Sequence, residues 1–138
     1  MLPAMARDPR FHHCCVNVAT GSLETAIELF ELLEFRVVYA PPGGARWIML
    51  GQQEPRCGLR SAEVEAEPIA DAGEKVPTHV ALLSDDPRAV LDRVEQWALS
   101  KGLAFRRGGW SQRELWFDLQ SVFLTFVVEV MHTSVEEE

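Results

Sequence analysis

The stretch FHHCC, residues 11 to 15, places two histidines beside two of the three cysteines of the chain. Histidine and cysteine are preferred ligands of zinc and of other transition metals. The stretch opens a short run of strand formers, and side chains alternate between the two faces of a strand. Alternation places His12 and Cys14 on one face and His13 and Cys15 on the other, so the stretch cannot surround one ion. His13 is its candidate metal ligand.

Two valines later in the same strand decide which of its faces is buried. Val16 and Val18 share the face of His12, and we expect them to pack beneath the helix that follows. His13 and Cys15 would then face a cavity. Because these two side chains lie about 7 Å apart along the strand, we expect Cys15 to be a buried structural thiol rather than a nucleophile.

The hydrophobic pattern predicts the order strand, helix, strand, strand, strand twice over. The first half has expected strands at 11–18, 35–40, 46–52 and 57–64 and a helix over 21–33; the second has strands at 78–84, 103–110, 113–119 and 122–131 and a helix over 85–102. We therefore predict a single α+β domain over residues 1–138. Its parts are module one (about 10–64), a linker (about 65–77), module two (about 78–131) and an acidic tail (132–138). Two βαβββ modules would form a half-open barrel around a cavity.

The first strand of the second half carries a histidine at the matching position. An offset of 66 residues maps His13 onto His79 and Val16 onto Leu82. The apolar residues then fall on the same face of both strands, which sends both histidines to the cavity side. The match predicts that the two histidines converge on one cavity.

The paired modules, the early histidine in each, and the segment GWSQRELWFDL (109–119) leading into VFLTFVVEVM (122–131) resemble the vicinal oxygen chelate superfamily. This superfamily includes glyoxalase I, extradiol dioxygenases, fosfomycin-resistance enzymes and bleomycin-resistance proteins. The resemblance covers roughly residues 10 to 131. It implies a small organic molecule as the partner and a homodimer. The turn before the last strand departs from the Asp-Pro-x-Gly of the family, because the chain has DLQS at 118–121.

The resemblance also implies that each module contributes a ligand from its first strand and one from its last. Alternation along 122–131 places Phe123, Thr125 and Glu129 on the cavity side. His13, His79 and Glu129 would then form a two-histidine, one-carboxylate set for a divalent zinc, nickel, iron or manganese ion. Counting from the hairpin, however, places the ligand position of the family nearer Thr125, about 13 Å from Glu129 along an ideal strand.

The last strand of module one departs further from a metal site. Arg60 or Ser61 falls near the expected ligand position, and Glu63 lies slightly beyond it. An arginine there would repel a cation and favour an anionic or carbonyl-bearing ligand. The tryptophans suit an aromatic-walled pocket, in which charged side chains, Arg113 and Glu114 among them, would orient a ligand. The residues expected to bind a ligand are His13, Cys15, Trp47, Arg60, His79, Trp110, Trp116, Thr125 and Glu129.

Composition limits the partners and the compartment. The net charge of −8 argues against nucleic acid or an anionic membrane surface. The start of the chain lacks the apolar stretch of a secretory signal, and an odd number of cysteines is no disulfide framework, so a cytoplasmic location is expected.

Two functions remain open from the sequence alone. The first is a small-molecule-binding protein of the glyoxalase/bleomycin-resistance type, without a complete metal site and without a cofactor. The alternative is a divalent-metal-dependent lyase, isomerase or dioxygenase that uses His13, His79 and Glu129.

Overall fold

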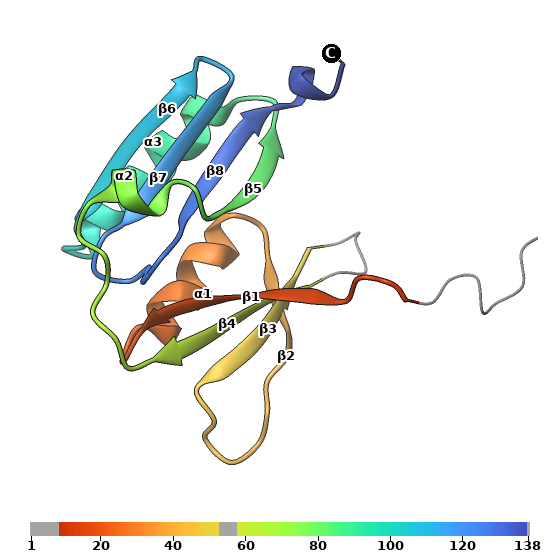
Figure 1. Cartoon of the computed structure of the whole chain (residues 1–138), viewed down its shortest axis with the longest axis vertical. Coiled ribbons are helices and arrows are strands. Elements are labelled where there is room, and N and C mark those ends of the chain that lie inside the picture. Colours follow the sequence, from red (N-terminus) through yellow and green to blue (C-terminus); the bar gives the residue numbers. More distant parts are fainter. Residues whose placement is uncertain (1–8, 53–57, 138) are drawn as a thin grey trace, which may run out of the picture.

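The computed structural model describes residues 9–52 and 58–137, and it contains the predicted βαβββ order twice (Figure 1). Module one consists of β1 (His13–Ala19), α1 (Leu23–Leu32), β2 (Arg36–Tyr39), β3 (Trp47–Gly51) and β4 (Gly58–Val64). Module two consists of β5 (His79–Ser84), α3 (Pro87–Ser100), β6 (Phe105–Ser111), β7 (Glu114–Leu119) and β8 (Val127–His132). A short helix, α2 (Ala72–Lys75), lies in the segment expected as a linker, and a 3₁₀ helix, η2 (Thr133–Glu137), occupies the expected tail. Residue 57, predicted to open the fourth strand, lies outside the described residues.

Each module forms one four-stranded mixed sheet. Sheet A has the strand order β1-β4-β3-β2, and sheet B has the order β5-β8-β7-β6. The first and last strands of each module are parallel neighbours, whereas the other pairs are antiparallel. The predicted α+β class with two βαβββ modules is confirmed.

A local sequence signal explains where α3 begins, whereas the start of α1 depends on a residue of β4. Asp86 caps α3, because its side chain accepts a hydrogen bond from the backbone N–H of Ala89 at 3.1 Å, and Pro87 follows at the first helical position. Ser22 makes no such bond at the start of α1. There the backbone N–H of Leu23 donates to the carboxylate of Glu63 in β4, at 2.9 Å. In the described part of the chain, no helix is long and apolar enough to cross a membrane.

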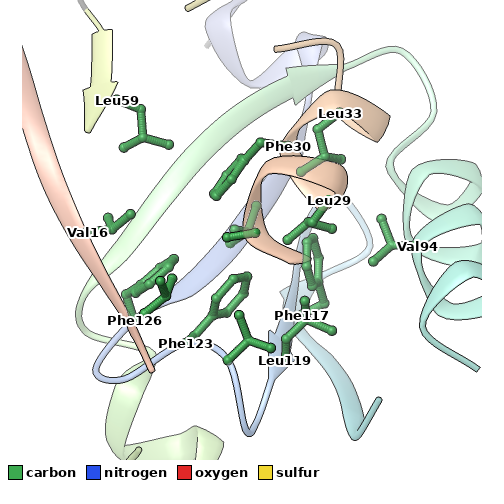
Figure 2. Packing of buried hydrophobic residues seen from close by; sticks show 14 of the residues in the cluster. Val16, Leu29, Phe30, Leu33, Leu59, Val94, Phe117, Leu119, Phe123 and Phe126 are labelled. Atoms are coloured by element: carbon green, nitrogen blue, oxygen red, sulfur yellow. The ribbon is translucent and has the colours of Figure 1, made fainter. Parts of the chain in front are cut away.

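The helix-facing sides of the two sheets share one continuous hydrophobic core (Figure 2). In it, Leu29 and Phe30 of α1 lie beside Val94 of α3 and Phe117 of β7. The opposite side of each sheet turns away from this core, and we call it the open face. Each module therefore presents an open face, on which side chains of its first strand, β1 or β5, are exposed.

The connection between β7 and β8 joins the two modules through the backbone. Phe123 forms a β-bridge with Val18 of β1, and the neighbouring N–H of Ala19 donates to the carbonyl of Val122 at 2.9 Å. The last strand predicted at 122–131 is therefore wrong at its start, because residues 122–124 bond to β1 of module one and β8 begins only at Val127. Phe123, expected on the cavity side, is fully buried, with its ring centre 4.3 Å from that of Phe126.

Candidate functional site

The two open faces hold all but one of the residues that the sequence predicted to bind a ligand. Sheet A carries His13, Cys15, Trp47 and Arg60. Sheet B carries His79, Trp110, Trp116 and Glu129. The exception is Thr125, which is exposed in the connection before β8.

His79 and Glu129 lie side by side on the open face of sheet B. His79 Nε2 is 3.6 Å from Glu129 Oε1, and His79 Nδ1 donates to the carbonyl of Val76 at 2.9 Å. A carbonyl can only accept, so this bond places a proton on Nδ1 and leaves Nε2 directed at the carboxyl group. The residue of the last strand that lies beside His79 is Glu129 and not Thr125. The reason is that the connection after β7 is long, so β8 begins only at Val127 and Thr125 precedes it.

The carboxyl group of Glu129 has an unusual environment for an acidic residue. Its side chain is only 8% exposed. Burial raises the pKa of Glu129, and the negative charge of Glu114 acts in the same direction, while His79 opposes the rise. A buried carboxyl group with a raised pKa, beside a histidine on an open sheet face, is typical of a functional site.

Two tryptophans give this pair an aromatic surrounding. Trp116 is the cross-strand neighbour of both Glu129 in β8 and Gly108 in β6. A Cβ on Gly108 would lie 2.5 Å from Cζ2 of Trp116, so the indole lies directly over the glycine. Trp110, which is 49% exposed, places its ring centre 5.8 Å from that of His79. The GG pair at 108–109 was a sequence signal for the close approach of Trp116. No sequence signal indicated the hydrogen bond between His79 and the carbonyl of Val76.

The open face of sheet A carries a different arrangement. The guanidinium carbon of Arg60 lies 4.3 Å from the ring centre of Trp47, and the ring of Tyr39 lies 5.7 Å from the same indole. Arg60 is level with Cys15 of the neighbouring β1. Cys15 is exposed, so the expected burial of this thiol is wrong for the described chain.

The alternatives to Arg60 in β4 have structural positions. Ser61 is fully buried on the helix side of sheet A. Glu63 accepts hydrogen bonds from Arg46 at 2.6 and 3.1 Å as well as from the first amide of α1. Arg46 holds the pKa of Glu63 at about 2, well below its usual range. Neither residue is available as a ligand on the open face.

The two histidines expected to converge do not meet within the described chain. His13 Nδ1 lies 2.8 Å from Nδ1 of its neighbour His12, whereas the contacts of His79 are with the linker residue just before β5 and with module two. Over residues 9–52 and 58–137, no group of three or more His, Cys, Asp or Glu side chains could hold a metal ion. His79 and Glu129 fit two positions of a metal site, and one chain does not bring His13 to them as the third.

A groove of about 660 Å³ runs beside the edge strand β5, between the two modules. Its lining includes Leu33 and Glu34 at the end of α1, Ala81 and Leu83 of β5, and Arg93 of α3. None of the residues predicted to bind a ligand lines it. The groove therefore lies next to the open face of sheet B without containing its chemical groups.

Solved structures share this architecture, although no family model and no curated protein matches the sequence. A mutant of the fosfomycin resistance protein FosX from Listeria monocytogenes, in complex with Mn(II) and 1S,2S-dihydroxypropylphosphonic acid, has a TM-score of 0.61 at 13% identity; 94% of this chain and 96% of that chain are covered. The antibiotic binding protein TnmS3 from Streptomyces sp. CB03234 has a TM-score of 0.54 at 19% identity, over 89% and 94% of the two chains. Lactoylglutathione lyase from Agrobacterium tumefaciens has a TM-score of 0.52 at 14% identity, over 92% and 96%.

The chain has the fold of the vicinal oxygen chelate superfamily. The resemblance stated from the sequence is therefore confirmed at the level of the fold. Identities of 13% to 19% carry no ligand and no reaction over to this chain. Within this fold, the function depends on the side chains that the two open faces present.

Proposed function

We propose that this protein binds a small organic molecule in an aromatic-lined cavity between two copies of the chain. The observation that carries the proposal is the His79–Glu129 pair, flanked by Trp110 and Trp116 on an open sheet face. Small-molecule sites combine apolar and aromatic walls with a few polar groups of fixed orientation, and this face offers both. Neighbours of the same fold support the proposal, since one of them is an antibiotic binding protein.

The second copy follows from the way in which the two modules pack. The helix sides of both sheets are packed in the shared core. The two open faces of one chain therefore cannot close on each other without breaking that core. On these faces Tyr39, Leu83 and Trp110 are 52%, 45% and 49% exposed. A second copy that places its sheet A against sheet B of the first would cover these side chains and enclose the site. The homodimer and the cytoplasmic location expected from the sequence are parts of this proposal.

The dimer is tested by sedimentation equilibrium on Leu83→Arg, with Leu99→Arg as the matched control. Leu83 lies on the open face of sheet B, whereas Leu99 is a 69% exposed residue of α3 outside that face. We expect the wild type and the Leu99 variant to be dimers and the Leu83 variant to be a monomer. A monomeric wild type would overturn the two-copy cavity.

Ligand binding is tested with a library of small organic molecules and ¹H–¹⁵N NMR. We expect bound compounds to shift the indole N–H signals of Trp110 and Trp116. Trp110→Ala should weaken binding by at least about tenfold, in the range of a lost aromatic contact, while Leu99→Ala should leave it unchanged. Compounds that shift only residues of the groove at Arg93 would refute a site on the open faces.

A second function, a divalent-metal-dependent lyase, isomerase or dioxygenase, is favoured by one specific observation. The bond from His79 Nδ1 to the carbonyl of Val76 is the kind of contact that orients a metal-ligating histidine. In a dimer, His13 of the second copy would complete the set with His79 and Glu129. A metal bound there would act as a Lewis acid on substrate oxygens.

Metal analysis of protein purified without chelators separates the two functions. The metalloenzyme requires stoichiometric metal in the wild type and its loss in His79→Ala. His132→Ala is the control, because His132 bonds to Ser134 outside the site. A wild type that stays free of metal after incubation with zinc, nickel, iron and manganese would eliminate the metalloenzyme.

A further inference from the structure

Within residues 9–52 and 58–137, Arg60 has no carboxylate partner, in contrast to Arg46 and Arg107. Arg46 and Arg107 each bind two carboxylates, at distances of 2.6 to 3.1 Å. Among the described residues, Arg60 has neither a hydrogen bond nor an ion pair, and its Nε is buried without a hydrogen-bond partner. The guanidinium instead stacks on the face of Trp47, with its carbon 4.3 Å from the ring centre. The described part of the chain thus holds a flat cation without a carboxylate partner on the open face of sheet A.

The position of Arg60 in module one is that of Glu129 in module two. Arg60 is level with Cys15 in the parallel pair β1–β4, and Glu129 is level with Ala81 in the parallel pair β5–β8. The offset of 66 residues that maps His13 onto His79 also maps Cys15 onto Ala81. Where one module presents a carboxylate beside its histidine, the other presents a guanidinium.

This exchange of charge bears on what the site can hold. A guanidinium has five donors, no acceptor and a permanent charge, so it cannot ligate a metal. Module one can therefore offer His13 but no carboxylate at the position equivalent to Glu129. An unpaired guanidinium is instead suited to two parallel hydrogen bonds with a carboxylate, a geometry that arginine provides and lysine does not.

We propose that Arg60 anchors a carboxylate group of the ligand. Stacking on Trp47, which in turn contacts Tyr39, fixes the plane of the guanidinium before the ligand arrives. The aromatic rings beside it would cover the apolar body of the same molecule. This inference rests on the proposed function and adds the chemical class of its ligand: a small aromatic carboxylate.

The test compares benzoate with its neutral amide benzamide, with phenylphosphonate and with benzylamine, by calorimetry and by NMR of the Arg60 Nε–H and the Trp47 indole N–H. We expect benzoate to bind most tightly and to shift both signals. Arg60→Gln should weaken benzoate binding by about tenfold to a hundredfold, the range for a charged hydrogen-bond pair, and should not change benzamide binding. The matched control is Arg88→Gln, an exposed arginine of α3 away from both open faces, which should change neither.

Failure of this inference can be told from failure of the proposed function. Tighter binding of benzylamine, benzamide or phenylphosphonate, or benzoate binding that is indifferent to Arg60→Gln, would overturn the carboxylate anchor while leaving a binding site in place. If no compound of the panel shifts any open-face signal at millimolar concentration, the carboxylate anchor fails. If the library of small organic molecules also shifts no open-face signal, the proposed function fails as well.

Discussion

The ion pair between Lys75 and Asp118 yields the sharpest stability prediction, because both side chains are fully buried. Lys75 Nζ donates to Asp118 Oδ1 at 3.0 Å and to the carbonyl of Phe123 at 2.7 Å. Replacing Lys75 by methionine keeps much of the volume but removes both charged hydrogen bonds and leaves a buried carboxylate without its counter-ion. Hydrogen bonds to charged groups contribute about 1.5–3 kcal/mol each, and breaking a buried pair costs about 3–5 kcal/mol in total. We therefore expect Lys75→Met to lose about 3–5 kcal/mol of the free energy of unfolding at pH 7.

Urea unfolding followed by tryptophan fluorescence measures this loss. The matched control is Lys101→Met, since the Lys101–Glu28 pair is 2.7 Å long but about half exposed, and this substitution should cost far less stability. Burial already raises the pKa of Asp118 in the wild type, and without Lys75 only the weaker attraction of Arg106 opposes that rise. The folded variant would then hold a proton that the unfolded chain releases, so its stability should fall as the pH increases from 5 to 7.

Two results would refute this reasoning. One is a loss below about 1 kcal/mol in Lys75→Met, which would mean that the buried pair contributes no more than an exposed one. The other is a double variant, Lys75→Met with Asp118→Leu, whose loss equals the sum of the two single losses. Removing both partners of a buried pair should instead recover much of the stability.

Three further predictions concern single residues. Glu63→Gln should lower the free energy of unfolding by about 1–2 kcal/mol at pH 7, a figure reduced because solvent surrounds Arg46. This loss should vanish as the pH falls from 4.5 to 2, because the pKa of Glu63 in the folded protein is about 2. A loss that does not depend on pH in urea unfolding would contradict this prediction. Glu129→Gln should gain stability relative to the wild type between pH 4 and pH 7, because burial raises the pKa of Glu129 and makes its charged form unfavourable; equal differences at both pH values would contradict it. Gly108→Ala should lose about 1–3 kcal/mol in thermal unfolding and displace the indole of Trp116, and an unchanged Trp116 signal in NMR would contradict the close approach.

The arrangement of elements could be predicted because local patterns and the fold agree. Val16 and Val18 sort the side chains of the first strand, and the structure buries both of them. The same alternation correctly sends Val128 and Val130 to the core and Glu129 to the open face, even though the beginning of that strand was predicted five residues too early. Period-two alternation survives an error in length, which is why the face of Glu129 was right.

The failures share a physical cause, namely contacts between segments far apart in the sequence. Phe123 follows the alternating pattern of a strand, yet its backbone pairs with Val18 and its ring fills the core between the modules. The contact of Trp110 with His79 likewise joins β6 to β5, which are opposite edge strands of sheet B, and no local spacing encodes it. The separation of His13 from His79 depends on how the two modules pack. The matched positions of the two histidines in the sequence contain no information about that packing.

The bridge between β1 and the β7–β8 connection also constrains the order in which the chain can fold. The N–H of Ala19 and the carbonyl of Asn17 find their partners in Val122 and Leu124, about 100 residues later. During synthesis, these groups of β1 therefore remain hydrogen-bonded to water until the chain has been made at least as far as Leu124. Module one should form its helix and most of its sheet early. The last backbone hydrogen bonds of β1 should form only when the β7–β8 connection of module two is present.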